Sequence, residues 1–525
     1  MRKPDLLMRI LERGARRAII SLDAIATRLY RTAWNPLHQT GTVAVVMLIL
    51  LLVTGLYLVI VYRIGSPAES VARLAQDPWL GAWMRTQHRY ASDVFVGAAL
   101  LHAMRIFGQG RSWGPRTMAW LTGVVLLGVG LVCAWTGFVM AWDTFGERLA
   151  REGARLLDIL PVFSEPISRV FAGDRPVPSA FFFVNLFVHL ALPLAMGATL
   201  WLHTSRVARP TLLPPKAVSW TIVLALTAAS VVFPAALGAA ADSFALPPTT
   251  PTNLIVAWWL PISERLAAPM AWSALLAPTA FAFIVPRLTR RPREGRFAPS
   301  VVDARLCTGC NQCPQDCPWE AITMVVREDD RPTLLARVDP LRCVSCGICA
   351  GACAPMGVGP PGRTGRDQLA RMRSDAQLPV RDALPIVAIV CEQAPARHVA
   401  AIRSRGASIL SVPCVGSVHT SVIEMVLKEG AAGVIVCGCP ARDCVNREGP
   451  KWLHERVYSE REAELQPRVD RRRVCLATFA PGDLPGSLAV YGTFALRVAL
   501  LDRPDHDAAA LLEAECDSLL INGSG

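Results

Sequence analysis

The sequence RTQHRYASDVFVGAALLHAMR occupies residues 85–105, and HLALPLAMGATLWLH occupies residues 189–203. Both stretches are apolar, and each contains two histidines 14 residues apart: His88 and His102, then His189 and His203. In an α-helix, 14 positions return to nearly the same face after a rise of about 21 Å. Each stretch therefore predicts a helix that carries, on one face, an imidazole near each of its ends.

These stretches belong to a larger apolar region. Runs long enough to cross a bilayer predict six spans, near residues 41–62, 89–108, 117–141, 181–204, 218–240 and 269–286. Basic residues outnumber acidic ones before the first span and in the second, fourth and sixth connections, which predicts cytoplasmic termini and a multi-pass inner-membrane location. The basic, amphipathic arm at residues 1–40 predicts a helix on the cytoplasmic membrane surface.

The four histidines form two predicted pairs. The second and fourth spans run in the same direction, so His88 should face His189 near the outer surface, and His102 should face His203 near the cytoplasm. Histidine is a common axial ligand of haem iron, which predicts two bound haems. A lone intramembrane histidine could simply hydrogen-bond a neighbouring helix, but two equally spaced pairs favour a cofactor.

Glycines repeat the same spacing. Gly41 and Gly55 are 14 residues apart in the first span, as are Gly123 and Gly137 in the third. A glycine at each level would let a flat macrocycle approach the backbone. Close helix packing is the alternative explanation of small residues in spans.

Residues 30–290 resemble cytochrome b of the quinol-oxidising bc and bf complexes. The resemblance rests on the two histidine stretches, on TGFVMAW at 136–142 and on LLDILPVFSEPISRVFAGD at 156–174. It implies that the four histidines bind two haems b and that Arg85 and Arg105 lie near haem propionates. It also implies membrane lipid and quinone as partners, and a homodimer.

The chain departs from that family where quinones would bind. In TPTNLIVAWWLP at 250–261, Trp258 matches the tryptophan of the family's Pro-Glu-Trp-Tyr motif, but Ala257 replaces the glutamate. Alanine cannot act as a general base, so quinol oxidation of the bc type is not expected. The family's inner quinone-pocket histidine is replaced by Ala208, near Arg206 and Arg209. Candidates for proton handling near the outer surface are Asp93 and Asp143, either of which could instead be a solvated helix end.

Fifteen of the 16 cysteines follow residue 300, on the predicted cytoplasmic side, where thiols stay reduced. CTGCNQCPQDCP at 307–318 and CVSCGICAGAC at 343–353 both have the spacing of bacterial two-cluster ferredoxins. In that pattern three thiolates hold one 4Fe–4S cluster and the fourth reaches the other. This predicts an α+β ferredoxin-like domain at 298–356 with two ligand sets: Cys307, Cys310, Cys313 and Cys353, then Cys343, Cys346, Cys349 and Cys317. Four-cysteine zinc sites are the alternative.

A glycine- and proline-rich linker is predicted at 357–384, before a last domain at 385–525. Short apolar runs at 386–391, 408–414, 433–439 and 473–479 alternate with helical stretches, which predicts a small α/β domain with a parallel sheet. Several cysteines fall at the carboxyl ends of these predicted strands, where open α/β sheets place their sites.

This domain resembles the delta subunit of methyl-viologen-reducing hydrogenase, best over VPCVGSVHTSVIEMVLKEGAAGVIVCGCPARDC at 412–444. The resemblance implies a 2Fe–2S cluster and a cytoplasmic flavoprotein, dehydrogenase or disulfide-reductase-like partner. The matching cysteines are Cys391, Cys414, Cys439 and Cys444. Cys437 could substitute for one of them, whereas Cys475 and Cys516 are expected to be structural. Buried reduced thiols without metal are the alternative.

Together these features predict a multidomain chain: an all-α transmembrane cytochrome b helix bundle (residues 41–290), the ferredoxin domain and the α/β domain. Its predicted function is electron transfer from a soluble flavoprotein or dehydrogenase, through iron–sulfur clusters and two b haems, to the quinone pool, with quinone reductase activity. The alternative is an anchor and conduit without a quinone site, which passes electrons to another membrane or periplasmic subunit. The net charge of +12 is explained by membrane topology rather than by nucleic-acid binding.

Overall fold

The structure is a computed structural model that describes residues 3–161, 165–171, 176–205, 209–242, 253, 255–291, 297–374 and 386–501. The chain divides into two compact units. One comprises Met1–Arg9 and Thr40–Thr289, and the other Ile10–Gln39 and Arg290–Gly525. The predicted multidomain architecture is confirmed: a helical membrane region precedes a small strand-containing domain and a domain with a parallel sheet.

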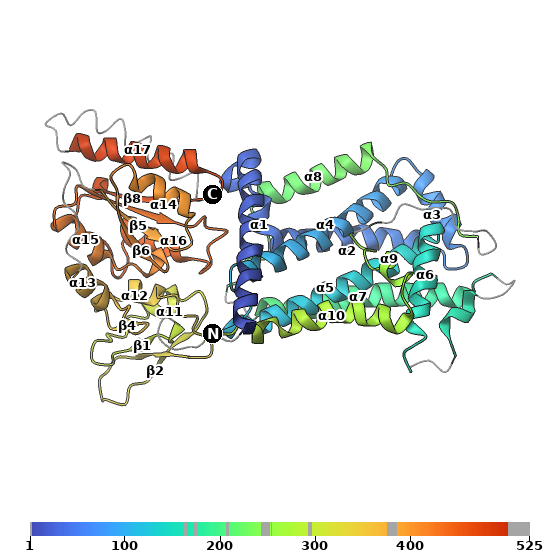
Figure 1. Ribbon diagram of the computed structural model, residues 1–525, viewed down its shortest axis with the longest axis horizontal. Helices are drawn as coiled ribbons and strands as arrows, with labels where there is room; N and C mark the ends of the chain where they lie inside the picture. Colours follow the sequence, from blue (N-terminus) through green and yellow to red (C-terminus); the bar gives the residue numbers. More distant parts are fainter. Residues whose placement is uncertain are drawn as a thin grey trace. The chain divides into compact units, whose positions relative to one another are not determined.

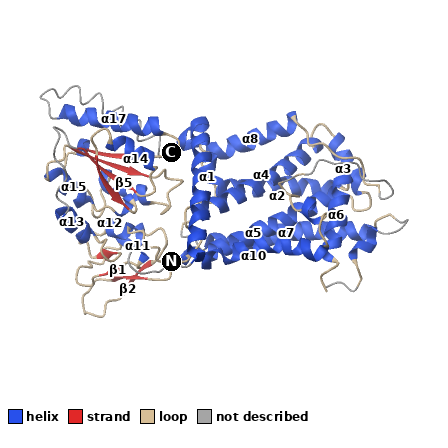
Figure 2. Cartoon of the chain, viewed as in Figure 1, coloured by secondary structure: helices blue, strands red, loops and turns tan. Residues whose placement is uncertain are grey.

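The first unit is a bundle of long apolar helices (Figures 1 and 2). Its main helices, each long and apolar enough to cross a membrane, are α2 (Thr40–Val61), α4 (Gly81–Gly108), α5 (Thr117–Ala141), α7 (Ser179–Ser205) and α10 (Ala268–Leu288). α2 lies along α4, and α5 lies along α7. Their outward-facing side chains are apolar, as lipid contact requires, so the protein is an integral membrane protein.

The fifth predicted span, residues 218–240, is helical only in α8 (Lys216–Val232). Pro234 follows two residues later. Proline has no backbone N–H and pushes the residue before it out of the helical conformation, so the helix ends there. At 17 residues, α8 is about 26 Å long, slightly less than the hydrocarbon core of a bilayer. A sixth helix with the length and composition of a span, α17 (Leu484–Leu501), belongs to the α/β domain and packs against its sheet.

Shorter helices fill the connections of this unit: α3 (Pro67–Gln76), η2 (Gly114–Arg116), α6 (Thr144–Leu157), η3 (Ile167–Phe171) and α9 (Leu260–Ser263). Asp143 is the N-cap of α6, where its carboxylate accepts a hydrogen bond of 2.8 Å from the Gly146 N–H and one of 3.0 Å from the Gly238 N–H. N-caps of this kind satisfy backbone donors that the helix leaves unpaired. Asp143 therefore caps a helix, and its role in proton handling stays a prediction.

The ferredoxin-like region has two antiparallel strand pairs and two short helices. β1 (Val301–Val302) pairs with β4 (Val358–Gly359), and β2 (Ile322–Val325) pairs with β3 (Leu335–Val338). The helices are α11 (Gln312–Asp316) and α12 (Ile348–Ala352), each of which lies within one of the two cysteine runs.

The α/β domain is built on a four-stranded parallel sheet with the order β6-β5-β7-β8: β6 (Ser408–Val412), β5 (Ile386–Cys391), β7 (Gly433–Gly438) and β8 (Val474–Thr478). One face packs against α15 (Thr420–Lys428) and α16 (Gly449–Tyr458), and the other against α14 (Ala396–Arg403) and α17. Short 3-10 turns lie at η5 (Val415–Ser417) and η6 (Arg471–Arg473). Because both faces are covered, β5 and β7 are buried along their whole length, as expected for parallel strands.

The predicted linker at 357–384 contains β4 and a helix, α13 (Gly365–Ser374); its last part lies outside the described residues. α13 packs against α15, and Gln368 bridges them: its Nε2 donates to the Ser417 carbonyl (2.8 Å), and its Oε1 accepts from the His419 N–H (3.1 Å). His419 Nε2 in turn lies 3.2 Å from the Cys353 carbonyl. Residues 365–374 thus join the ferredoxin-like region to the α/β domain.

The N-terminal arm forms α1 (Lys3–Trp34), which is broken at Arg31, and the turn η1 (Pro36–Gln39). One side of α1 is buried, including Ile19, Asp23 and Ala26. An adjacent side exposes large apolar side chains, among them Leu7, Leu11, Leu22, Ile25 and Leu29. The helix is amphipathic, and its location on the membrane surface stays a prediction.

Candidate cofactor sites

The outer histidine pair meets between two helices. His88 on α4 and His189 on α7 have ring centroids 6.4 Å apart. The Nδ1 atom of His88 lies 2.9 Å from the Thr54 hydroxyl, and that of His189 lies 3.0 Å from the Thr136 hydroxyl. Since Nδ1 is engaged in both rings, Nε2 is the nitrogen left to bind iron. This arrangement fits a haem with two axial histidines.

The second pair, His102 and His203, occupies the other level of the same helices. The Nδ1 atom of His203 lies 3.1 Å from the Thr122 hydroxyl on α5, as in the outer pair. His102 lies against α2 at Gly41 and His203 against α5 at Gly123. Both levels therefore repeat one local arrangement, in which a helix with histidines lies along a helix with threonines and glycines.

All four predicted glycines lie against the four histidines. A methyl group on Gly41 would come within 2.9 Å of the His102 ring, and one on Gly137 within 2.9 Å of the His189 ring. The corresponding distances are 3.2 Å from Gly55 to His88 and 3.3 Å from Gly123 to His203. In the structure, the space beside each glycine is therefore taken by an imidazole. The absence of a side chain lets that ring lie directly against the neighbouring helix backbone.

Sequence reasoning missed the threonines, although a signal was present. Each of the four glycines follows a threonine, and the pairs begin at Thr40, Thr54, Thr122 and Thr136. Three of these hydroxyls contact a histidine Nδ1. A threonine in a helix also donates back to its own turn, as Thr54 does to the Leu50 carbonyl at 2.7 Å, so its oxygen lone pairs remain for an imidazole N–H. The Thr-Gly repeat is therefore a sequence signature of the site.

Gly137→Ala is expected to weaken or abolish binding of the outer haem, because the new methyl group would displace the His189 ring. The measurement is haem content per chain and the absorbance of the reduced b haems. Gly128→Ala on the same helix is the matched control, since nothing lies within 4 Å of a methyl group there. Equal haem content in both variants would contradict close packing of the His189 ring against Gly137.

Arg85 and Arg105 flank the histidines of α4. The Arg85 Nη2 donates to the Ala235 carbonyl, while its buried Nε has no hydrogen-bond partner among the described residues. The Arg105 side chain is buried. A partly buried guanidinium with an enclosed, unsatisfied Nε donor is a suitable neighbour for a carboxylate, so Arg85 fits the propionate role that the resemblance implies.

The outer-surface candidates have identifiable contacts. Asp93 pairs with Arg89 at 3.1 Å and accepts a hydrogen bond of 2.9 Å from the Asn253 amide. Ala257 is fully buried in an apolar cluster that includes Val139, Trp142 and Leu260, so no acidic group occupies the glutamate position. Of the inner-pocket positions, Ala208 and Arg206 lie outside the described residues.

The eight ferredoxin-type cysteines separate into two groups, as the spacing predicts. One cavity is lined by Cys307, Cys310, Cys313 and Cys353, and the other by Cys317, Cys343, Cys346 and Cys349. Both cavities are otherwise mostly apolar. Burial raises the pKa of Cys346 well above its ordinary value, so metal binding is what would hold these sulfurs as thiolates. We call the cavities site I and site II in that order.

Backbone and hydroxyl donors approach sulfur atoms at both sites. The Gly357 N–H lies 3.3 Å from Cys353 Sγ at site I. At site II, the Ala321 N–H lies 3.4 Å from Cys317 Sγ, and the Ser300 hydroxyl lies 3.3 Å from Cys349 Sγ. Hydrogen bonds to sulfur raise the reduction potential of iron–sulfur clusters, which makes these donors candidates for tuning.

A third cysteine group lies at the carboxyl edge of the parallel sheet. Strand order reverses between β5 and β7, and ligands of open α/β sheets bind at such a switch point. Cys391 ends β5 and Cys439 follows β7, with their sulfurs 3.6 Å apart. Cys444 is hydrogen-bonded to both Cys414 and Cys439. The four predicted residues thus converge, and we call this group site III.

The sulfurs of site III compete for protons. Hydrogen bonding with Cys444, together with burial, raises the pKa of Cys414 well above its ordinary value, while hydrogen bonds from Cys414 and Cys439 lower the pKa of Cys444. A cluster that binds all four as thiolates removes this competition, so the donor set fits an iron–sulfur cluster.

Cys437 cannot replace a ligand of site III. Side chains of a strand alternate between the two faces of a sheet, and Cys437 lies on the opposite face from Cys391. It packs there with Cys475, which is also buried in that core. Cys516, the remaining predicted structural cysteine, lies outside the described residues.

Cys414→Ser and Cys437→Ser are expected to differ sharply, because only the first sulfur belongs to site III. Cys414→Ser should change or abolish the electron paramagnetic resonance signal of that cluster and lower the iron content. Cys437→Ser should leave both unchanged and at most destabilise the core. The measurement is the spectrum of the reduced protein with iron per chain, and an identical response of the two variants would contradict the assignment.

Sites II and III are joined by direct contact. Cys346 of site II packs against a buried apolar cluster formed by Ile348, Cys414 and Trp452. Ligands of two neighbouring sites therefore lie in one small apolar group. Electrons tunnel efficiently only between nearby cofactors, so this contact marks where the sites would exchange them.

Comparisons with known proteins divide the chain in the same way. Residues 27–209 match the family described as Cytochrome b/b6/petB, residues 306–357 match the 4Fe-4S dicluster domain, and residues 386–501 match the delta subunit of methyl-viologen-reducing hydrogenase. The chain therefore joins a region similar to cytochrome b to regions similar to iron–sulfur domains, which supports a membrane electron-transfer subunit. Haem b and iron–sulfur clusters are the cofactors that these matches imply.

Individual relatives that match the membrane part include two cytochrome b subunits. The menaquinol:cytochrome c reductase cytochrome b subunit of Geobacillus thermodenitrificans is 25% identical over 189 residues, which are 33% of this chain and 83% of the relative. Cytochrome b6 of Acaryochloris marina is 25% identical over 187 residues, 34% of this chain and 86% of the relative. Among solved structures, a chain of the hyperthermophilic respiratory Complex III is similar with a TM-score of 0.39 and 16% identity, over 47% of this chain and 74% of that one.

Proposed function

We propose that the protein passes electrons from a cytoplasmic flavoprotein or dehydrogenase to the membrane quinone pool. The observation that carries the proposal is the contact between Cys346 and the cluster containing Cys414, since it places a hydrogenase delta-subunit-like site next to a ferredoxin-like site in one chain. The soluble partner would dock on the α/β domain and reduce a 2Fe–2S cluster at site III.

The order of the carriers follows from the contacts. Electrons would pass from site III to site II, whose ligand Cys346 it touches, and then to site I. At site I, Cys310 is exposed, whereas the described cysteines of sites II and III are buried or partly buried. Site I therefore presents the accessible edge from which electrons would leave for the inner haem, between His102 and His203, and then the outer haem.

The cofactors carry the redox chemistry in this scheme, and the chain's residues hold them in place and set their environment. The threonines would fix the orientation of the imidazoles, and Arg85 would neutralise a propionate. The donors near Cys349 and Cys353 would favour the reduced, more negative form of each cluster.

Electron flow towards quinone is supported by the residue that replaces the family's glutamate, Ala257. Relatives of the membrane part include a subunit named for menaquinol:cytochrome c reductase, which makes a menaquinone-type partner a reasonable substrate to test. Ala257, however, lies in an apolar cluster where that family has a carboxylate for the quinol proton. Quinone reduction is therefore the favoured direction.

The same observation supports a second candidate. Without an acidic group at residue 257, the chain could lack a quinone site of its own and act as an anchor and conduit. Electrons would then leave the outer haem for another membrane or periplasmic subunit.

Anaerobic haem reduction distinguishes the two functions. A menaquinol analogue is added to membranes that contain the protein alone, and b-haem absorbance is followed before and after dithionite. Quinol reduction of a large share of the dithionite-reducible haem, blocked by a quinone-site inhibitor, is expected for a quinone-linked protein. Haem that responds only to dithionite, at quinol potentials low enough to reduce it, would replace the proposal with the conduit function.

A further inference from the structure

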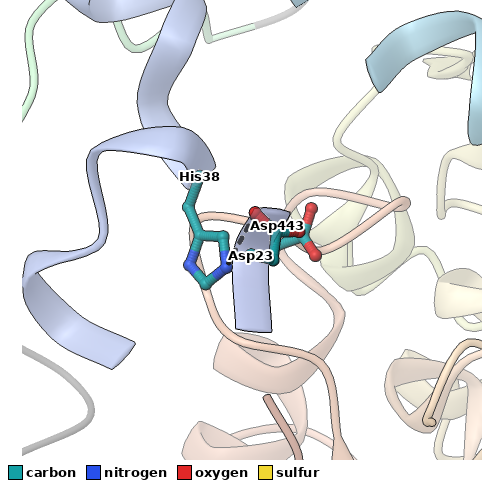
Figure 3. Close-up of side chains that lie close together, drawn as sticks. All are labelled: Asp23, His38 and Asp443. Atoms are coloured by element: carbon teal, nitrogen blue, oxygen red, sulfur yellow. Dashed lines mark ion pairs between the residues drawn. The ribbon is translucent and has the colours of Figure 1, made fainter. Parts of the chain in front are cut away.

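A further group of possible metal ligands lies in the second unit. Asp23 on α1, His38 in η1 and Asp443 in the loop between β7 and α16 each offer one ligand atom, and all three atoms lie within 4.8 Å of one another (Figure 3). Asp23 is 1% exposed and His38 is 7% exposed, and Asp443 is partly buried. Two consecutive elements of the N-terminal arm and a loop far along the chain thus contribute to one site.

The chain bends sharply to bring His38 back to Asp23. Helix α1 is broken at Arg31, whose φ of +59° lies in the left-handed region, and the chain then turns through Asn35. The fully buried Asn35 amide donates to the Thr27 hydroxyl at 3.0 Å, and its Oδ1 accepts from the Leu37 N–H at 2.9 Å. These bonds fix the turn and place His38 over α1.

The distances favour a shared ion over a direct contact. His38 Nε2 and Asp23 Oδ1 are 3.9 Å apart, which is too far for a hydrogen bond. Two ligands bound about 2.1 Å from one ion are separated by roughly 3–4 Å. The Asn35 amide nitrogen also lies 3.4 Å from His38 Nε2. The same amide nitrogen donates to the Thr27 hydroxyl at 3.0 Å and lies 3.4 Å from the Asp23 carbonyl, so its N–H groups have other acceptors and the Nε2 lone pair can serve a metal ion.

Charge points the same way. Two carboxylates close together in a buried place repel each other strongly when both are ionised. A divalent cation bound by both carboxylates would remove this repulsion. The imidazole and carboxylate donors together suit zinc and similar first-row ions, which commonly take three protein ligands and a water.

We propose that Asp23, His38 and Asp443 bind a divalent transition-metal ion, with Zn²⁺ as the expected occupant. The ion ties helix α1 to the loop between Cys439 and Cys444, two of the cysteines of site III. Close packing of α1 on the same domain supports this attachment: a methyl group on Gly482 would come within 2.3 Å of the Ala24 backbone. The proposal does not depend on the direction of electron transfer or on the presence of a quinone site.

Metal content and affinity test the site. The purified full-length protein, with its iron cofactors, is treated with EDTA and titrated with Zn²⁺, and zinc per chain is measured by mass spectrometry after desalting. One retained zinc per chain is expected for the wild type, with at least a tenfold loss of affinity in Asp23→Asn, His38→Gln and Asp443→Asn. Asp470→Asn is the control, because this carboxylate pairs with Arg472 at the surface.

Zinc can also occupy cysteine sites, so its ligands must be identified. X-ray absorption at the zinc edge of the wild type is expected to show nitrogen and oxygen at about 2.0–2.1 Å and no sulfur at about 2.3 Å. A sulfur shell, no retained zinc, or equal zinc in the three variants and the control would overturn the proposal. The absorption result uses only the wild type, so it decides the question even if a variant fails to fold.

Discussion

Replacing His88 with leucine is expected to leave one b haem per chain in place of two. Leucine fills a similar apolar volume between α4 and α7 but cannot bind iron, so the outer haem should be lost while the inner one remains. His102→Leu should give the same count with the other haem missing. Haem content by the pyridine haemochrome and the reduced spectrum measure both. His454→Leu, at an exposed position on α16, is the control that should keep full haem content.

Double variants test the pairing itself. In the outer pair, His88 on α4 faces His189 on α7, and their ring centroids are 6.4 Å apart. His88→Leu/His189→Leu should therefore still retain one haem, because both changes fall on the same level. His88→Leu/His102→Leu should retain none. The opposite pattern would mean that the two histidines of one helix serve the same haem, and unchanged content would refute ligation altogether.

The largest loss of stability is expected from Arg456→Met. This side chain is fully buried and reaches across the second unit to Asp316, the fully buried residue that precedes Cys317. Its three nitrogens donate to the carbonyls of Trp452, Val418 and Gly416. Burial lowers the pKa of Arg456 to about 10 and Asp316 opposes that shift, so the guanidinium is charged at neutral pH. Removing one partner of a buried pair typically costs about 3–5 kcal/mol.

The measurement is the temperature at which the visible iron–sulfur absorbance is lost on heating, since a multidomain chain does not unfold in one step. Arg456→Met should lower this temperature by many degrees. Arg472→Met is the matched control, because its ion pair with Asp470 is exposed and worth about 0–1 kcal/mol. Equal effects of the two changes would show that Arg456 does not hold the ferredoxin-like region to the α/β domain.

The repeated spacings were sufficient to predict much of the structure. A period of 14 along a helix fixes both face and level, so His88, His102 and their partners could be placed before any coordinates. The ferredoxin spacing predicts two groups of four cysteines, and the same two groups line two cavities, because short turns allow few ways to surround one cavity. The central strands β5 and β7 were predictable because they are short apolar runs that end in cysteine or glycine.

Other features depend on contacts between distant segments and have no local signal. The burial of Arg456 has no local signal in the sequence, and only the tertiary structure shows Gly351 leaving room for its guanidinium. α13 was hidden by the glycines and prolines that precede it. Cys437 was a plausible ligand by spacing alone, and strand alternation removed it only once β7 was defined.

The 14-residue spacing also has an electrical consequence. An axial rise of about 21 Å between the two histidine levels is roughly two thirds of a hydrocarbon core of about 30 Å. A full crossing of one charge is worth about 2.3 kcal/mol per 100 mV, so transfer between the haems would be worth about 1.6 kcal/mol at that voltage. With cytoplasmic termini, an inside-negative membrane would pull electrons from the inner haem towards the outer one. The rate of this step should therefore depend on membrane potential, and a collapsed potential would slow outward transfer.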